Sequence, residues 1–321
     1  MLNGFAKGYS GVSADLVRLI LQRIEQNSFP KIDASGTVGA SDLVPLAQLS
    51  DWILSSTAAI ELGLPRPKEA LSMMNSNAIT LSLGVNRLAE LKRLTQIQEL
   101  VAAVTMKGFR CNLNAIHWQV NEVHCRGGQK QVASRLRAYL QGSKLWEFEE
   151  ARYTQDPLSF RCITQVHGAM DELLKNAELV LSEELNSLDD NPIVDQASLL
   201  ARSHGNMDTT RYTLMVDQLR QAVAKLADLS GERIQKLQWP AFSNLPIGLS
   251  SEHSPMGGVQ FLNLGHIAAS LVTSIKIWAQ PHLLISVGQL ADGVEDTAGN
   301  ASHTVHDLER QIEAGWTLAA N

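Results

Sequence analysis

Residues 83–108 run LGVNRLAELKRLTQIQELVAAVTMKG, and this stretch decides the fold. Its apolar side chains recur at steps of three and four residues, which is the spacing that lines one face of an α-helix. The same pattern fills residues 165–188, 206–237 and 259–280. Because helices of this length usually pack along one another, the sequence predicts an all-α protein built as a long, roughly parallel and antiparallel helix bundle.

Three shorter helices are predicted before the long ones. Residues 10–28 carry an apolar stripe that begins behind Ser13, a residue type that caps helices. A second helix starts near Asp42, whose negative charge suits the positive end of a helix, and a third covers residues 68–81. Strand-type alternation is weak and confined to residues 193–201. The apolar faces exceed what one bundle needs, which favours a homo-oligomer.

The composition is that of a folded protein with a sizeable core. The chain has 321 residues, of which 45% are hydrophobic and 19% charged, and this length suits one large or two ordinary domains. The net charge of −6 and the lack of a basic run argue against a nucleic-acid-binding surface. No 18-residue apolar run predicts a membrane span, and no signal pattern opens the chain, so a cytoplasmic location is expected.

Cysteine and histidine spacing indicates no metal site and no disulfide framework. The three cysteines are odd in number and lack CxxC spacing, which is typical of reduced thiols. The nine histidines form no HExxH motif, although His117 and His124 could share a helix face. Ser41 lies in no Gly-x-Ser-x-Gly elbow, which disfavours a Ser-His-Asp nucleophile.

The most informative motif is GTVGASDLVPLA at residues 36–47. It resembles the signature of the aromatic amino acid lyases, the mostly helical family of histidine and phenylalanine ammonia-lyases. In that family an Ala-Ser-Gly tripeptide cyclises into a methylidene-imidazolone (MIO), an electrophile made from the chain itself. Here Ala40, Ser41 and Asp42 stand at this place, and the glycine is missing. An intact Ala34-Ser35-Gly36 lies about two helical turns upstream and is interpreted as a coincidence.

Further motifs resemble those of the family in the same order along the chain. They are Asn3 with GYSGV at 8–12, KEAL at 68–71 with Asn75, GQ at 128–129 with LR at 136–137 and GS at 142–143, QDPLSFRC at 155–162 with QVHG at 165–168, NS at 186–187 with DNP at 190–192, GN at 205–206, and ED at 295–296. The resemblance implies one lyase-like helical domain over residues 1–321. It also implies that the family's N-terminal third, with a loop carrying the tyrosine base, is absent.

The resemblance implies roles for individual residues. Arg161 would pair with the substrate carboxylate, a task that suits a planar guanidinium. Asn75 and Gln155 would hydrogen-bond MIO and substrate, and Glu295 would accept a proton near the substrate amine. Each of these side chains also fits a purely structural role: a salt bridge for Arg161, polar bonding in a helical core for the two amides, and an exposed helix end for Glu295.

Two other positions depart from the family pattern. Leu158 replaces the usual tyrosine of the Gln-Asp-Pro-Tyr-Ser motif, and a leucine neither donates nor accepts a proton. Met207 stands where an aromatic residue follows Gly-Asn, with Asp208 in place of a histidine. Both changes would make a substrate pocket more apolar.

The preferred interpretation is an ammonia-lyase or aminomutase that acts on an aromatic α-amino acid through MIO. The resemblance also implies a homotetramer with sites built from several subunits, so a separate N-terminal chain could supply the tyrosine. The alternative is a divergent or inactive lyase scaffold, which would serve as a partner or regulatory subunit or bind an amino acid-like ligand without MIO. Histidine, phenylalanine and tyrosine all remain possible substrates.

Overall fold

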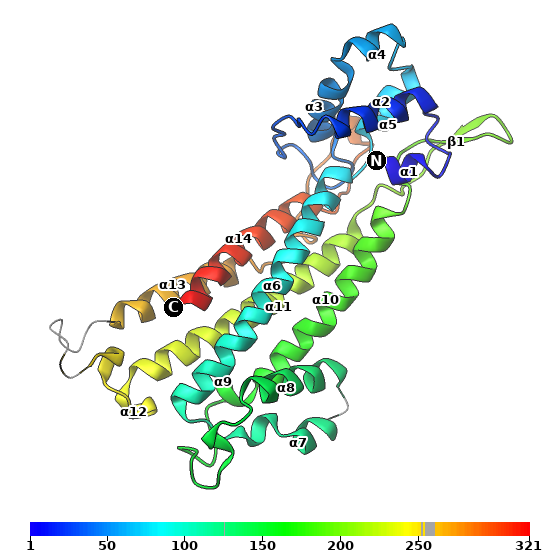
Figure 1. Ribbon diagram of the computed structural model, residues 1–321. Helices are drawn as coiled ribbons and strands as arrows, with labels where there is room; N and C mark the ends of the chain where they lie inside the picture. The colour runs from blue at the N-terminus through cyan, green and yellow to red at the C-terminus, as the bar shows by residue number, and fades with distance from the viewer. Residues whose placement is uncertain (125, 252, 254–260) are drawn as a thin grey trace. The chain divides into compact units, whose positions relative to one another are not determined.

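The structure is a computed structural model that describes residues 1–124, 126–251, 253 and 261–321. Helices dominate these residues, as predicted, and the only strands among them form one short hairpin (Figure 1). The described chain falls into two compact units. Unit 1 comprises residues 1–86, 177–217 and 281–306, and unit 2 comprises residues 87–176, 218–280 and 307–321.

Unit 1 begins with a group of short helices that lie together in Figure 1. They are α1 (Leu2–Phe5), α2 (Ala14–Glu25), α3 (Leu43–Leu54), α4 (Thr57–Glu61) and α5 (Pro67–Met74). The predicted cap of α2 is confirmed, because the Ser13 hydroxyl accepts a hydrogen bond from the Leu16 backbone amide. A core of apolar side chains from these helices includes Leu16, Ile53 and Met73, all almost fully buried.

The helices of unit 2 pack in pairs as a bundle. The long elements are α6 (Ala78–Phe109), α10 (Ile163–Leu185), α11 (Thr210–Gln238), α13 (Leu262–Ile277) and α14 (Ala301–Ala320), of which α6, α10, α11 and α14 have residues in both units. The shorter ones are η1 (Leu113–Ile116), α7 (Trp118–Glu122), α8 (Gly127–Tyr139), η2 (Lys144–Trp146), α9 (Leu158–Arg161), α12 (Pro240–Ser243) and η3 (Ile247–Leu249). Gly315 of α14 lies against Leu94 of α6, and Gly231 of α11 lies against Val272 of α13. The predicted bundle is thereby confirmed.

A charged cluster ties three of these helices together. The Arg135 guanidinium of α8 donates to both carboxylate oxygens of Glu99 on α6, at 2.7 Å each, and to Asp171 on α10 at 3.1 Å. Glu99 is almost fully buried, so its charge needs this bidentate partner. The pairing fixes the rotation of α8 against the two long helices.

The weak strand candidates form a real hairpin. Strands β1 (Ile193–Asp195) and β2 (Leu200–Arg202) pair antiparallel, with Val194 opposite Ala201. In unit 1 the remaining described 3-10 turn, η5 (Ala291–Gly293), precedes α14.

One predicted helix is divided. The pattern predicts a single helix over residues 68–81, but α5 ends at Met74 and α6 starts at Ala78. Asn75, at the end of α5, has a backbone conformation outside the helical region. The break follows because the polar groups of residues 75–77 bond to distant segments instead of to a continuous helix. His117 and His124 do not share a helix either, since His117 caps the start of α7, which ends at Glu122.

The described helices were also considered as membrane spans. None of them has the combination of length and apolar character needed to cross a bilayer.

Candidate functional site

The segment that carries the family signature is tightly enclosed within unit 1. Gly39 has a positive φ of 84°, and a Cβ there would lie 2.7 Å from the Ala301 backbone nitrogen. The Gly39 carbonyl accepts a hydrogen bond from the Thr209 hydroxyl at 2.7 Å, and the Val38 carbonyl accepts one from the Asn300 amide at 2.7 Å. Only a glycine fits this close approach, so the signature glycine has a packing role.

Two asparagines hold Ser41. The Ser41 hydroxyl donates to the Asn75 side-chain oxygen at 2.7 Å, and the Ser41 amide donates to the Asn77 side-chain oxygen at 3.1 Å. The Asn75 amide group donates in turn to the Asn191 carbonyl at 2.5 Å, while that of Asn77 donates to the Met207 carbonyl at 2.9 Å. The break between α5 and α6 therefore places both asparagines around one serine.

Asp42 is bonded at both its carboxylate and its backbone nitrogen. Its side chain is 0% exposed. One carboxylate oxygen accepts from the Thr80 hydroxyl at 2.7 Å and from the Thr37 hydroxyl at 3.0 Å, and the other accepts from the Thr80 amide at 2.7 Å. Its own amide donates to the Ser76 carbonyl at 2.7 Å. Burial raises the pKa of the Asp42 carboxyl above its usual range, and these hydrogen bonds oppose that shift.

Two other motif residues hold the surroundings of Asn75. The Lys68 ammonium donates to both carboxylate oxygens of the buried Asp190 at 3.0 Å. The carboxylate of Glu69 accepts from the backbone amides of Ser13 at 2.9 Å and Arg66 at 2.7 Å. The Lys68 ion pair fixes the turn at 190–192, whose Asn191 carbonyl bonds Asn75.

Unit 2 contains a separate cavity of about 330 Å³. It is lined by Phe109, Tyr153, Gln155, Asp156, Pro157, Arg161 and Phe242. The Arg161 side chain donates through its ε nitrogen to the Asp156 carbonyl at 2.7 Å, and its terminal nitrogens bond no described residue. The Tyr153 hydroxyl donates to the Phe242 carbonyl at 3.1 Å. The cavity thus combines an oriented guanidinium with an amide and three aromatic rings.

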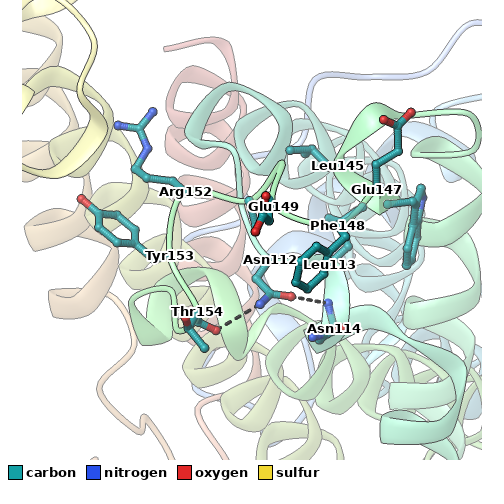
Figure 2. A pocket seen from close by; sticks show the side chains of 12 residues that line it. Asn112, Leu113, Asn114, Leu145, Glu147, Phe148, Glu149, Arg152, Tyr153 and Thr154 are labelled. Carbon is teal, nitrogen blue, oxygen red and sulfur yellow. Dashed lines mark hydrogen bonds between the residues drawn. The ribbon is translucent and has the colours of Figure 1, made fainter.

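A larger neighbouring cavity of about 610 Å³ shares Tyr153 with the first (Figure 2). It is lined by residues 112–114, 145–149 and 151–154, together with Trp146. Figure 2 shows Asn112 bonded on both sides: its amide donates to the Thr154 carbonyl at 3.1 Å, and its side-chain oxygen accepts from the Asn114 amide at 3.0 Å. These contacts brace the segment that leads into Gln155.

The expected site residues are distributed over both units. Unit 1 brings Ala40, Ser41, Asp42, Asn75 and Met207 into one hydrogen-bonded group, in which Ala40 forms an isolated β-bridge with Asp208. Glu295 also belongs to unit 1, where its backbone pairs with Leu290. Gln155 and Arg161 share the cavity of unit 2, whereas Leu158 is 63% exposed and lines a different cavity with Cys162 and Lys236.

Sequence reasoning missed Asn77 and Tyr153. Asn77 lies two residues after Asn75, and Tyr153 lies two residues before Gln155, so proximity to a motif is the only sequence signal for either. Among the described residues, no group of three or more His, Cys, Asp or Glu side chains could hold a metal ion. Cys111 and Cys162 are free thiols, and Cys125 lies outside the described residues.

Comparison with known proteins gives a consistent result. The family model described as aromatic amino acid lyase matches residues 1–321. Histidine ammonia-lyase of Shouchella clausii is 33% identical over 327 residues, which cover 96% of this chain and 65% of that protein. Histidine ammonia-lyase of a Geobacillus species is 31% identical over 308 residues, which cover 90% of this chain and 60% of that protein. The chain therefore spans less than two thirds of the length of these relatives.

Solved structures share the fold. Histidine ammonia-lyase from Trypanosoma cruzi superimposes with a TM-score of 0.82 and 26% identity, covering 98% of this chain and 62% of that one. The ergothioneine-degrading enzyme ergothionase from Treponema denticola gives a TM-score of 0.89 with 24% identity, covering 98% of this chain and 66% of that one.

Proposed function

We propose a carbon–nitrogen lyase function for this chain, which belongs to the aromatic amino acid lyase family. The proposed reaction is the non-oxidative elimination of the amine from an aromatic α-amino acid of the histidine, phenylalanine or tyrosine type, or from a close analogue. The observation that carries the proposal is the cavity that Arg161 and Gln155 share with three aromatic rings. A cytoplasmic homotetramer, with a further subunit that supplies a tyrosine, is proposed from the family resemblance alone.

Arg161 is proposed to bind the substrate carboxylate. Its ε nitrogen is held by the Asp156 carbonyl, which limits rotation of the guanidinium. The two terminal nitrogens remain available, and a guanidinium edge matches a carboxylate with two parallel hydrogen bonds. Gln155 adds a neutral donor and acceptor at the same cavity.

The aromatic rings of the cavity are proposed to hold the substrate ring. Phe109 and Tyr153 lie with their ring centroids 6.2 Å apart, within the range of an aromatic pair. Phe242 is tied to Tyr153 by the hydrogen bond to its carbonyl, so the two side chains are positioned together. An aromatic ring next to a carboxylate is the shape that these residues favour.

The family's electrophile would have to come from Ala40, Ser41 and Asp42, and the hydrogen bonds around Asp42 do not fit that group. We therefore assign carboxylate binding to Arg161 and proton acceptance to Glu295, without MIO. Within the family this leaves ammonia-lyase and aminomutase as alternative outcomes of one elimination.

A turnover assay tests the proposal. Wild-type protein supplied with phenylalanine, tyrosine or histidine is expected to form a product that absorbs in the ultraviolet, of the cinnamate or urocanate type. Arg161→Ala is expected to lower kcat/KM by about 100-fold, because a charge-assisted bidentate contact contributes roughly 2–3 kcal/mol. Arg202→Ala in the hairpin is the matched control, because Arg202 pairs only with Asp195 and Ser198. Equal rates for both variants would contradict the role of Arg161.

The second candidate function is binding of an amino acid-like ligand without turnover. The replacement by Leu158 favours it, because a leucine cannot transfer a proton. The same assay separates the two candidates. Ligand binding that depends on Arg161, together with no product from any of the three amino acids, would support the binding function and contradict the lyase.

A further inference from the structure

We infer that this chain makes no MIO group and that Ala40, Ser41 and Asp42 remain an ordinary peptide. The inference concerns the signature segment of the proposed lyase, but it rests on hydrogen bonds in unit 1 that are independent of the Arg161 cavity. It removes the chain-derived electrophile from the possible chemistry of this protein.

The chemistry of the ring sets the requirement. The backbone nitrogen of the third residue must bond to the carbonyl carbon of the first, and that carbonyl oxygen leaves as water. The serine then loses its α-hydrogen and its hydroxyl as a second water, which leaves the methylidene group. The third residue must therefore move toward the first, and its nitrogen must give up its hydrogen. A glycine there is free to move, because it has no side chain to hold it.

Asp42 is held against this movement. Its nitrogen is a hydrogen-bond donor to the Ser76 carbonyl, a bond that ring closure would eliminate. Its carboxylate, fully buried, accepts from Thr80 twice and from Thr37. Shifting Asp42 toward Ala40 would strip a buried carboxylate of these partners, and a carboxylate without partners is strongly disfavoured in an interior.

Ser41 shows how the loop has closed over the missing residue. Its φ is +76°, the left-handed region that normally favours glycine. The serine thus takes the glycine-type conformation, and the next residue already caps α3. The Ser41 hydroxyl donates to the Asn75 side-chain amide, a neutral group that cannot serve as the base for dehydration.

The intact tripeptide at 34–36 does not substitute for it. The Ser35 amide donates to the Asp33 carboxylate at 2.9 Å, and Ser35 is exposed to solvent. Asn75 and Asn77, which surround Ser41, bond neither Ser35 nor Gly36 among the described contacts. A group formed at 34–36 would lack the surroundings that the signature segment has.

Intact-mass spectrometry of the purified wild-type chain tests the inference. We expect the full mass of the sequence, with peptides 34–36 and 40–42 unmodified after proteolysis. A deficit of two water molecules located at either tripeptide would overturn the inference. Because mass is read without substrate, this result is independent of turnover: an unmodified chain that fails to bind amino acids would contradict the proposed function and leave this inference standing.

An insertion between Ser41 and Asp42 gives a matched second measurement. Inserting glycine restores the family's spacing and frees the third position from the Asp42 contacts, so we expect a deficit of two waters in this variant. Inserting valine restores the length but not the freedom, and we expect its full mass. Circular dichroism establishes that both variants are helical. Full mass in a folded glycine variant would overturn the assignment of the block to Asp42.

Discussion

The loop around Ser41 and the cavity around Arg161 treat their polar groups in opposite ways. In the loop, the polar groups of Ser41 and Asp42 meet partners within the chain. In the cavity, Arg161 uses one nitrogen for the chain and leaves the others directed to no described residue. Satisfied polar groups stabilise a fold, whereas unsatisfied ones beside a cavity are available to a ligand. The first region therefore reads as a structural element and the second as a binding element.

Asp42→Ala should give the largest effect on stability. It leaves buried donors of Thr80 and Thr37 without an acceptor, so we expect unfolding to become easier by roughly 3–5 kcal/mol. Urea denaturation measures this, with Asp15→Ala as a control because Asp15 forms an exposed ion pair with Arg18. If both variants unfolded at the same urea concentration, the loop would not be the structural element described here.

Asn75→Ala should have a smaller effect on stability. It removes the acceptor of the Ser41 hydroxyl and the donor to the Asn191 carbonyl, and we expect a loss of about 2 kcal/mol. Asn206→Ala, at an exposed position, is the control for asparagine replacement. A thermal midpoint unchanged by Asn75→Ala would show that the network around Ser41 adds nothing to the fold.

His167 tests a buried polar group in unit 2 that has no partner. It is 0% exposed, and neither ring nitrogen has a hydrogen-bond partner among the described residues. Burial, and then the charges of Arg233 and Arg135, lower the pKa of His167 to about 3. The unfolded chain binds a proton below about pH 6.5 and the folded chain does not, so stability falls as the pH drops from there toward 3.

The expected slope from this histidine approaches about 1.4 kcal/mol per pH unit below pH 6. His167→Leu removes it, whereas His266→Leu, at an exposed site, should keep the wild-type profile. Unfolding curves at pH 7, 6 and 5 measure the difference. Parallel profiles for wild type and His167→Leu would contradict a buried neutral ring.

Tyr153 sharpens the description of the cavity with the smallest effect. If its ring holds the ligand, Tyr153→Phe should lower the affinity for an aromatic amino acid by no more than about threefold, because one neutral hydrogen bond contributes roughly 0.5–1.5 kcal/mol. Tyr153→Ala should lower it by about tenfold. Calorimetric titration measures both, with the exposed Tyr139→Phe as control. Equal losses in the two Tyr153 variants would mean that the hydroxyl, not the ring, matters.

Local sequence patterns predicted the helices well because their causes are local. The Ser13 cap and the apolar repeat of residues 83–108 act within a few residues, and both have their expected consequence in α2 and α6. The end of α5 was missed because its cause is distant. Asn77 bonds Met207, 130 residues away, and Asn75 bonds Asn191.

The candidate site was accessible to sequence reasoning only through motifs. The motifs named Arg161 and Gln155, which share a cavity, and Leu158, which lines another one. They could not name Tyr153 or Phe242, because the chain brings these two together from segments 89 residues apart. The consequence of the missing glycine was also invisible, since it depends on where the Asp42 carboxylate points.

Calorimetric titration of phenylalanine, tyrosine and histidine into wild type and Arg161→Ala tests the central claim most directly. The claim is that the unpaired guanidinium of unit 2 binds the carboxylate of an aromatic amino acid. We expect the Kd of at least one of the three to rise by about 100-fold in Arg161→Ala, and by about tenfold in Arg161→Lys, which keeps the charge but loses the second hydrogen bond. The same Kd in wild type and Arg161→Ala would contradict the claim.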